Sequence, residues 1–331
     1  MIQIGVIGCG YWGPNYVRVF NELSESRVKW CCDLDKKNLE NIKKLYPEIK
    51  VTRDYKEVAK DSEVDAAVIV TPVKTHYQVA KHFLKEGKHL LVEKPFTNEV
   101  LQAKELIKIA KAKHLVLMVG HVYLYNAGIR MLEEIIRKKE LGKIYYLKAE
   151  RIGLGPIRKQ ASALWDLAIH DIYIALYLLK KSPLKVSAEG NSFLQKGIED
   201  SVNLNLKFHK NIFCTIYANW FAPEKVRKLT VVGSRSMAVF DDVNKQEMLK
   251  IYERKINKKL FNSTPEYSDH QNIVTIGDVY IPNIKQSEPL KNQAKHFLEC
   301  ISENKEPLTD AQDGLNVVKI LEAVETSIKK Q

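Results

Sequence analysis

The chain has 331 residues, which exceeds the size at which one hydrophobic core keeps growing, so we expect two domains. Hydrophobic residues make up 45% of the chain and charged residues 28%, a composition that excludes a disordered or low-complexity protein. The net charge is +12, but lysines are interleaved with glutamates and no motif that reads nucleic acid accompanies them. We therefore expect a solvated basic surface, with attraction of an anionic small substrate as the alternative, and no nucleic-acid partner.

The sequence predicts no targeting segment, membrane span or cysteine site. The chain runs from Met1 directly into a predicted strand, and no stretch approaches the roughly 18 apolar residues of a membrane span. We therefore expect a cytoplasmic protein without a membrane partner. The cysteines contain no C-x-x-C motif and no Cys/His ligand spacing, which argues against disulfides and structural zinc, so we expect no metal. They are Cys9, Cys31, Cys32, Cys214 and Cys300.

The first 120 residues alternate short apolar strands with helical patterns, which is typical of βαβ units around a parallel sheet. The predicted strands are residues 2–7, 28–33, 66–70, 89–92 and 115–119. The predicted helices are residues 14–23, 36–45, 75–86 and 99–113. We therefore expect a doubly wound α/β Rossmann domain over residues 1–120.

The pattern changes after Gly120, where longer strands with two-residue periodicity and close turns predict an open, mainly antiparallel sheet. The predicted strands are residues 143–151, 201–208, 211–220, 226–233 and 236–242. Helices are predicted over residues 126–139, from near Trp165, and over 289–303 and 310–329. We expect an α+β domain over residues 121–331 for substrate binding and oligomerisation, whose C-terminal helix packs back on the first domain. Residues 243–286 are weakly patterned, and no element is predicted there.

Three glycines follow the first predicted strand in the segment GVIGCGYWGPN, at Gly8, Gly10 and Gly13. A lone G-x-G-x-x-G pattern is common, but here it lies between a predicted strand and a helix, and Pro14 suits the first turn of that helix. Glycines there permit a tight turn and a close approach of the backbone to a pyrophosphate at the helix N-terminus. The loop predicts a dinucleotide site, with a bare strand-to-helix turn as the alternative.

The second predicted strand ends at Asp33, where a carboxylate would accept hydrogen bonds from an adenosine ribose and repel a 2′-phosphate. Leu34 and Asp35 follow without an arginine, which favours NAD over NADP. Lys36 and Lys37 keep NADP as the alternative.

Two further motifs carry candidate catalytic groups. In GKHLLVEKPF a predicted strand ends in Glu93-Lys94-Pro95, at the sheet edge where ligands of open α/β sheets bind. An exposed lysine at a strand end is the alternative. In LWDLAIHDIYIALYLL, Asp166 and His170 are four positions apart on a predicted helix and share one face. A helix cap with a core histidine is the alternative there, and zinc is disfavoured because no third ligand is spaced nearby.

Together these motifs resemble the glucose-fructose oxidoreductase and inositol dehydrogenase (Gfo/Idh/MocA) family over nearly the whole chain. Further marks are Thr71-Pro72 with His76 and the C-terminal segment KHFLECISENKEPLTDAQDG. The resemblance implies a dinucleotide domain joined to an α+β domain whose open sheet builds a homodimer or homotetramer. It implies a catalytic group of Lys94, Asp166 and His170. It places the cofactor at Gly8, Gly10, Tyr11, Trp12, Gly13, Asp33, Thr71, Pro72, His76, Glu93 and Lys94.

The chain departs from the family pattern near the predicted catalytic helix. Many members carry two glycines before the aspartate and a glycine two positions before the histidine, whereas this chain has Leu164, Trp165 and Ala168. Position 293, often acidic in relatives, is Gln293. Because the acid/base spacing is kept, these departures put the shape of the substrate in doubt and not the type of reaction.

The motifs GYWGPN, GHVYLYN, RIGLGPIR and LWDLAIHD resemble the branch of the family that oxidises UDP-N-acetylglucosamine or its uronate at C3. Arg151 and Arg158 offer planar, permanently charged groups suited to a pyrophosphate, and Gly155-Pro156 would bend the chain between them. Surface arginines are the alternative. Asn126 is a candidate hydrogen-bond partner for the sugar or the phosphates, with a helix cap as the alternative.

The predicted reaction is oxidation of a secondary alcohol, the C3 hydroxyl, of a nucleotide-linked sugar with NAD. His170 is the first choice of base because an imidazole titrates near about 6.5, Lys94 would stabilise charge on the oxygen, and Asp166 would orient them. Lys94 as the base is the alternative. Alternative functions are an inositol, polyol or free-sugar dehydrogenase, an NADPH-dependent reductase of 3-keto nucleotide sugars, and a cofactor-bound sensor.

Overall fold

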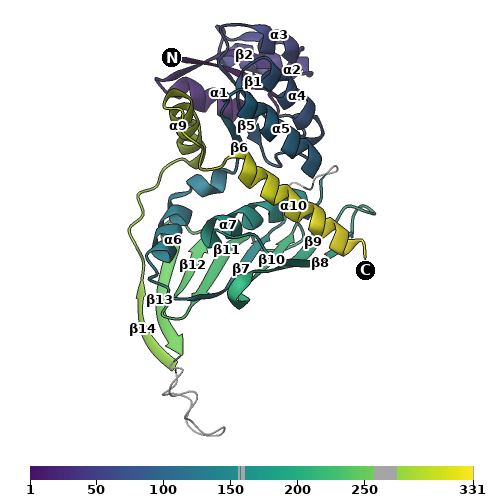
Figure 1. Cartoon of the computed structure of the whole chain (residues 1–331). Helices are drawn as coiled ribbons and strands as arrows, with labels where there is room; N and C mark the ends of the chain where they lie inside the picture. Colours follow the sequence, from purple (N-terminus) through teal and green to yellow (C-terminus); the bar gives the residue numbers. More distant parts are fainter. Residues whose placement is uncertain (156, 158–160, 257–273, 331) are drawn as a thin grey trace. The chain divides into compact units, whose positions relative to one another are not determined.

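The computed structural model describes residues 1–155, 157, 161–256 and 274–330 and divides into two units (Figure 1). Unit 1 comprises Met1–Tyr125 and Ser287–Glu322. Unit 2 comprises Asn126–Gln286 and Ala323–Gln331. Helix α10 (Ala311–Ile328) begins in unit 1 and ends in unit 2.

Unit 1 is built on a six-stranded parallel sheet in the order β3-β2-β1-β4-β5-β6. The strands are β1 (Ile2–Ile7), β2 (Ser26–Cys32), β3 (Lys50–Thr52), β4 (Ala66–Ile69), β5 (His89–Glu93) and β6 (Leu117–Gly120). This is the strand order of a doubly wound Rossmann sheet, the fold that the sequence predicts, and it includes the short strand β3, which was not predicted. Because the strand order reverses between β1 and β4, the carboxyl ends of these two strands form the point where ligands bind in such sheets.

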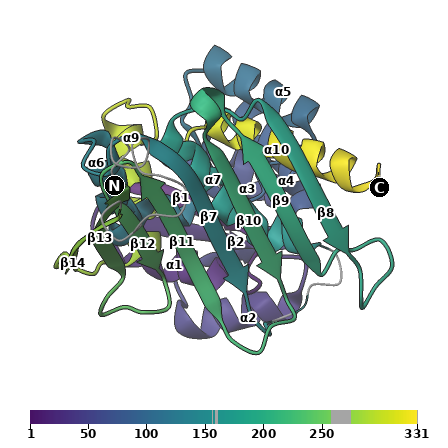
Figure 2. The same cartoon turned by 90° about the horizontal axis from the view of Figure 1, so that it is seen from below.

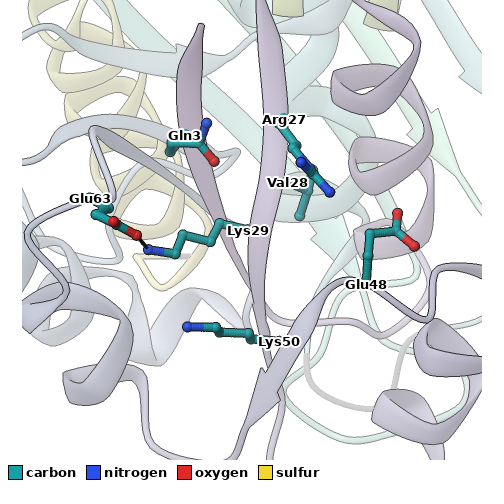
Figure 3. A pocket seen from close by; sticks show the side chains of 7 residues that line it. All are labelled: Gln3, Arg27, Val28, Lys29, Glu48, Lys50 and Glu63. Atoms are coloured by element: carbon teal, nitrogen blue, oxygen red, sulfur yellow. Dashed lines mark hydrogen bonds and ion pairs between the residues drawn. The ribbon is translucent and has the colours of Figure 1, made fainter.

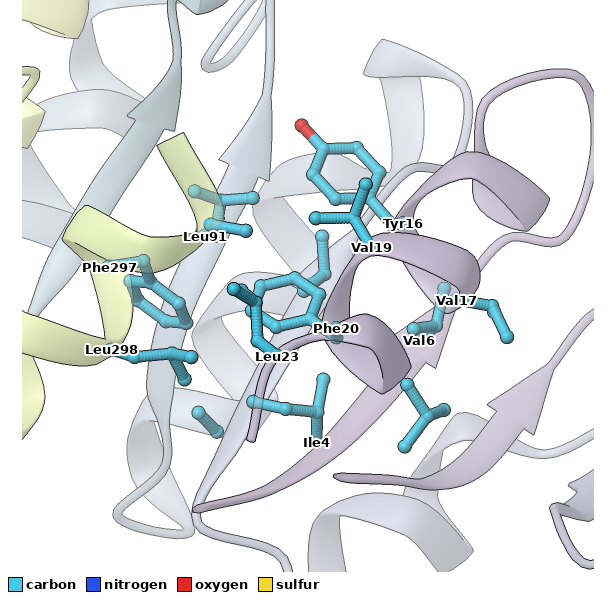
Figure 4. Close-up of a cluster of buried hydrophobic side chains, with 14 of the residues drawn as sticks. Ile4, Val6, Tyr16, Val17, Val19, Phe20, Leu23, Leu91, Phe297 and Leu298 are labelled. Atoms are coloured by element: carbon cyan, nitrogen blue, oxygen red, sulfur yellow. The ribbon is translucent and has the colours of Figure 1, made fainter. Parts of the chain in front are cut away.

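Helices cover both faces of this sheet, and its central strands are apolar on both sides. Successive residues of β1 point to opposite faces, so Val6 packs with α1, α2 and α9, whereas Ile7 packs with α3, α4, α5 and α10. Phe20 of α1 meets Phe297 of α9 edge to face, with ring centroids 6.4 Å apart, inside the first cluster (Figure 4). The helices are α1 (Gly13–Glu22), α2 (Lys36–Leu45), α3 (Tyr55–Lys60), α4 (Val73–Lys85), α5 (Val100–Ala112), the 3-10 helix η1 (Val122–Tyr125), α9 (Pro289–Ser302) and α10.

Unit 2 is built on an eight-stranded sheet in the order β14-β13-β12-β11-β7-β10-β9-β8 (Figure 2). The pair β7 and β10 is parallel and the other pairs are antiparallel, which confirms the predicted mainly antiparallel sheet. The strands are β7 (Ile144–Ile152), β8 (Lys185–Asn191), β9 (Ser201–Lys207), β10 (Phe213–Asn219), β11 (Val226–Gly233), β12 (Met237–Asp241), β13 (Leu249–Ile256) and β14 (Val274–Tyr280).

Helices α6 (Ala127–Arg137) and α7 (Ile169–Leu179) cover one face of this second sheet (Figure 1). Strand β9 shows the resulting alternation, because Leu204 and Leu206 are buried while Asn203 and Asn205 are exposed. Within the described residues of both units, no helix is long and apolar enough to cross a membrane.

Candidate active site

The loop between β1 and α1 takes its shape from two of its glycines. Gly8 has a φ of 98°, and a Cβ there would lie 2.8 Å from the carbonyl group of Val70, after β4. A Cβ on Gly13 would overlap the carbonyl oxygen of Gly8. At Gly10, by contrast, a Cβ would meet none of the described atoms within 4 Å, so the fold itself does not require glycine there. The open space at Gly10 fits a pyrophosphate lying close to the backbone at the start of α1.

Two aromatic side chains of this loop point into solvent. Tyr11 is 80% exposed and Trp12 is 43% exposed, and their rings meet edge to face with centroids 5.9 Å apart. Trp12 is the residue before α1 and makes no side-chain hydrogen bond to cap that helix. Both residues stay predicted cofactor contacts.

Asp33, immediately after β2, is held by two backbone N–H groups. Its Oδ2 accepts a hydrogen bond from Cys9 at 2.6 Å, and its Oδ1 accepts one from Asp35 at 2.8 Å. The carboxylate is thereby fixed beside the glycine loop, where an adenosine ribose would lie in a Rossmann domain.

An arginine that the sequence analysis missed contacts Leu34, the residue after Asp33. Arg53 follows β3, is exposed, and donates from Nε to the carbonyl oxygen of Leu34 at 3.0 Å. Arg53 is 20 residues from Asp33 in the sequence and directly follows β3, a strand that was not predicted. The fold therefore places a permanent positive charge at Leu34, one residue after the carboxylate that is expected to exclude NADP.

We predict that Arg53 affects the binding of NADPH more than that of NADH. In Arg53→Ala we expect the dissociation constant of NADPH to rise about tenfold, the loss of one charge-assisted contact to a 2′-phosphate. The dissociation constant of NADH should change less than about twofold, because NADH lacks that phosphate. Fluorescence titration of the reduced cofactors measures both, with Lys60→Ala on α3 as a control. An equal weakening of the two cofactors would contradict the prediction.

His76 connects the loops that follow β4 and β5. Its side chain is buried, with Nδ1 2.8 Å from the carbonyl oxygen of Pro95 and Nε2 2.7 Å from that of Thr71. Burial lowers the pKa of His76, while these carbonyl groups act in the opposite direction. The ring therefore ties the segment that contains Lys94 to the neighbouring strand end. Direct contact of Thr71, the exposed Pro72 or His76 with the cofactor stays a prediction.

Lys94 stands between the last residue of β5 and Pro95, with which it forms a cis peptide bond. The Glu93 carboxylate accepts a hydrogen bond from the Tyr16 hydroxyl at 2.5 Å and one from the Lys94 backbone N–H at 3.0 Å. Burial raises the pKa of Glu93. His121, directly after β6, is buried, and burial together with the charge of Lys94 lowers its pKa to about 3. A neutral imidazole therefore lies near Lys94, a feature that the sequence analysis missed although the position of His121 at the same sheet edge could have indicated it.

In unit 2, Asp166 lies in a π-helical turn (Leu164–Ala168) that continues directly into α7. The sequence predicts a regular helix here, and the wider turn is a correction. Single π-helical turns inside helices often occur at functional sites, because they displace side chains from the regular helical positions. His170, in the first turn of α7, has Nδ1 2.8 Å from the hydroxyl oxygen of the buried Tyr173. This contact orients the imidazole, with the tyrosine hydroxyl able to donate to Nδ1 or accept from it.

Arg151 does not offer its planar guanidinium to solvent. Its Nε and Nη2 donate to the two carboxylate oxygens of Asp171 at 2.8 and 3.0 Å, and both side chains are buried. The two-pronged group that we expected to bind a pyrophosphate is therefore paired with a carboxylate of α7. Arg158 and Pro156 lie outside the described residues.

Asn126 is the N-cap of α6, the alternative that the sequence left open. Its Oδ1 accepts from the backbone N–H groups of Gly128 and Ile129 at 2.8 and 3.4 Å, and its Nδ2 donates to Asp242 at 3.3 Å. The side chain is buried, so a contact with substrate stays only a prediction.

A surface depression of about 470 Å³ lies at the opposite end of the unit 1 sheet, beside the amino ends of the first strands (Figure 3). Lys29 on its wall is ion-paired with Glu63. The depression is away from the carboxyl ends of β1 and β4, where ligands bind in doubly wound sheets. Its lining is Gln3, Arg27, Val28, Lys29, Glu48, Lys50 and Glu63.

Two family models match the chain. Residues 2–121 match the model described as an oxidoreductase family with an NAD-binding Rossmann fold. Residues 129–239 match the model described as a GFO/IDH/MocA C-terminal domain.

Similar proteins include two dehydrogenases of sugars and polyols. The UDP-N-acetylglucosamine 3-dehydrogenase of Acidithiobacillus ferrooxidans is 29% identical over 254 residues, which are 76% of this chain and 77% of that protein. The myo-inositol 2-dehydrogenase of Thermotoga maritima is 22% identical over 301 residues, 87% of this chain and 90% of that protein. A solved structure of the Acidithiobacillus enzyme has the same fold, with a TM-score of 0.84 at 23% identity over 99% of this chain and 98% of its own.

Proposed function

Because the chain belongs to the Gfo/Idh/MocA oxidoreductase family, we propose that it is an NAD-dependent dehydrogenase of a nucleotide-linked sugar. The substrate we propose is UDP-N-acetylglucosamine or a close analogue, oxidised at the C3 hydroxyl. The observation that supports this type of reaction is the position of Lys94 at the carboxyl edge of the unit 1 sheet, where Glu93 holds its backbone. The glycine loop at the same edge leaves room for a pyrophosphate. Similarity to UDP-N-acetylglucosamine 3-dehydrogenase over three quarters of the chain supports the substrate class.

The cofactor would be held by unit 1. When bound, NAD supplies the hydride acceptor. The backbone at Gly8, Gly10 and Gly13 would hold its pyrophosphate and Asp33 its adenosine ribose. The fixed carboxylate of Asp33 supports NAD, and the neighbouring Arg53 keeps NADP as the alternative that the titration above tests.

We assign the proton transfer to His170 and the stabilisation of charge on the substrate oxygen to Lys94. An imidazole is a suitable base near neutral pH, and the Tyr173 hydroxyl orients the ring for this task. The Lys94 ammonium would donate a hydrogen bond to the substrate oxygen as the hydroxyl proton passes to His170. Asp166 would orient the substrate and the base.

A second candidate is the oxidation of a polyol or free sugar. The pairing of Arg151 with Asp171 favours it, because one of the two arginines expected to bind a pyrophosphate is already paired. Similarity to myo-inositol 2-dehydrogenase is in agreement with this candidate.

We predict that the enzyme requires the diphosphate of a nucleotide-linked sugar, which distinguishes this substrate from a polyol or free sugar. With NAD present, kcat/KM for UDP-N-acetylglucosamine should exceed that for N-acetylglucosamine and for myo-inositol by at least about a hundredfold, the effect of one or two charge-assisted contacts. Absorbance of reduced nicotinamide follows turnover, and mass spectrometry identifies the 3-keto product. His170→Asn serves as the control for product formed by contaminating enzymes. Faster oxidation of myo-inositol would leave the family assignment in place and contradict the nucleotide-sugar substrate.

We also propose that the protein acts in the cytoplasm as a homodimer or homotetramer assembled through the uncovered face of the unit 2 sheet. The alternation of buried and exposed residues along β9 supports an uncovered face. Light scattering on the purified protein measures the mass of the assembly.

A further inference from the structure

We propose that Tyr16 is a positioning residue for the dehydrogenase reaction, because its hydroxyl holds the Glu93 carboxylate that in turn holds Lys94. The inference rests on the proposed function for its turnover measurements, and on the geometry of unit 1 for everything else. It assigns a role to a tyrosine of α1 that lies 77 positions before Glu93 in the sequence.

The tyrosine ring is fixed by its surroundings. Tyr16 is fully buried in the cluster between the sheet and helices α1 and α9, and its ring stacks on Phe20 with centroids 6.3 Å apart. Figure 4 shows the Tyr16 oxygen at the margin of this cluster, pointing away from the apolar side chains that surround its ring. Since a buried aromatic ring has only two side-chain torsions, this packing sets the place of the hydroxyl.

The carboxylate of Glu93 occupies a space that the neighbouring strand leaves open. Its Oε1 accepts from Tyr16 at 2.5 Å and its Oε2 accepts from the Lys94 backbone at 3.0 Å. Gly120 on β6 lies opposite Glu93, and a Cβ there would come within 3.0 Å of the Glu93 Cδ and Oε1 atoms. The two hydrogen bonds and the glycine together fix the carboxylate beside Lys94.

The groups around Glu93 favour its charged form against the effect of burial. Burial raises the pKa of Glu93, whereas the Tyr16 hydroxyl, the Lys94 charge and the Lys94 N–H lower it. The pKa of Tyr16 is itself raised well above the usual range, chiefly by burial and by Glu93. Gln293 of α9 lowers that pKa and Tyr125 of η1 raises it. The Tyr16 hydroxyl therefore keeps its proton and stays a hydrogen-bond donor. On the β6 side, the neighbouring His121 is uncharged at neutral pH. Lys94 is therefore the cation that faces Glu93 among these groups.

Placing a carboxylate at this position costs free energy, so packing alone does not explain its presence there. A partly buried charge loses hydration, and an apolar side chain of similar volume would fill the space without that loss. What the carboxylate adds is a negative charge and a hydrogen-bond acceptor at the residue that is proposed to stabilise the substrate oxygen. The Tyr16 hydroxyl keeps that charge in one place and favours its ionised form.

Tyr16→Phe tests the proposal, because it keeps the ring and removes the hydroxyl. We expect kcat for UDP-N-acetylglucosamine to fall roughly 10- to 100-fold, as for the loss of a hydrogen bond to a charged group, with the dissociation constant of NADH changed less than about twofold. Removing a donor that lowers the Glu93 pKa raises that pKa. The proposed base His170 sets an acidic limb of the kcat profile, and protonation of Glu93 should add to it at a higher pH in this variant. The limb should therefore move to higher pH, a shift that a merely structural role would not cause.

Tyr77→Phe is the matched control. The Tyr77 hydroxyl donates to Glu105 at 2.5 Å in the same unit, and this pair joins α4 and α5 outside the Glu93 cluster. We expect Tyr77→Phe to lower the free energy of unfolding without moving kcat or the acidic limb. If Tyr16→Phe and Tyr77→Phe behave alike in kcat and in the pH profile, the proposal is overturned.

Two further measurements decide the outcome when turnover of Tyr16→Phe is not measurable. Acetylation of Lys94 by acetic anhydride, followed by peptide mass spectrometry, needs no substrate, and we expect it to be faster in Tyr16→Phe than in the wild type. If the wild type does not oxidise UDP-N-acetylglucosamine, the proposed substrate is wrong, and the acetylation rate alone supports or overturns the role of Tyr16.

If Tyr16→Phe does not fold, Glu93→Gln replaces it. In Glu93→Gln the acidic limb set by His170 should remain, while kcat on the pH plateau falls roughly 10- to 100-fold. A plateau kcat equal to that of the wild type overturns the proposal.

Discussion

Lys94→Ala is expected to lower kcat by about 10³-fold, while the dissociation constant of NADH changes less than about twofold. The lysine lies at the carboxyl end of β5, where Glu93 fixes its backbone, and its ammonium would stabilise the substrate oxygen only as negative charge develops. Its removal should therefore raise the barrier of the chemical step and leave cofactor binding in place. Steady-state kinetics with UDP-N-acetylglucosamine and a fluorescence titration with NADH measure the two effects.

Lys88, the residue before β5, provides a control. It precedes β5 at the other end, is buried, and donates from Nζ to the carbonyl oxygens of Asp61 and Val64 at 2.9 and 2.6 Å. Lys88→Ala should lower the free energy of unfolding by about 1–3 kcal/mol because two buried carbonyl groups lose their donor, with kcat unchanged. If Lys94→Ala keeps the turnover of the wild type, Lys94 has no part in the mechanism.

Lys94→Arg separates the two roles considered for this residue. An arginine still donates hydrogen bonds but does not lose its proton at working pH, so it cannot act as a base. Residual activity well above that of Lys94→Ala supports the hydrogen-bonding role. Equal activity of the two variants, with an intact fold, would instead favour Lys94 as the base.

The Rossmann elements could be predicted because their strands are buried on both faces and read as short apolar runs between amphipathic helices. The missed strands, β3, β8, β13 and β14, lack that signal. Strand β8 buries Ala188 and β13 buries Leu249, and their other residues are partly or fully exposed. Strand β3 has only three residues, and β14 is exposed along its whole length, so its pairing with β13 depends on backbone hydrogen bonds and not on a hydrophobic alternation.

The candidate site divides in the same way between local and distant features. The glycine loop and Asp33 could be predicted because a strand, a loop and a helix follow one another in the sequence. The contacts of the site residues with distant parts of the chain could not be predicted. Arg53 contacts Leu34 from the end of β3, and Tyr16 of α1 contacts Glu93 at the end of β5. Such contacts depend on strand order and register, which the pattern of a single sequence leaves open.

The pairing of Arg151 with Asp171 leads to the largest expected effect on stability. Removing one partner of a buried ion pair leaves an uncompensated charge, so Arg151→Met and Asp171→Leu are each expected to lower the free energy of unfolding by about 3–5 kcal/mol. The double variant should recover most of this loss, because two apolar side chains replace two buried charges. Urea titrations of the four proteins measure the coupling, and the exposed Lys148 on the same strand gives the control Lys148→Met, with little expected change.

The double variant also tests the role that the sequence suggested for Arg151. If Arg151 only holds α7 against β7, the folded double variant should keep the KM for UDP-N-acetylglucosamine within about threefold of the wild type. A KM raised by more than about tenfold in a stable double variant would mean that the guanidinium also binds the diphosphate. The comparison works because the second substitution restores the stability that the first removes, so that the change in KM reports on the lost charge and not on unfolding.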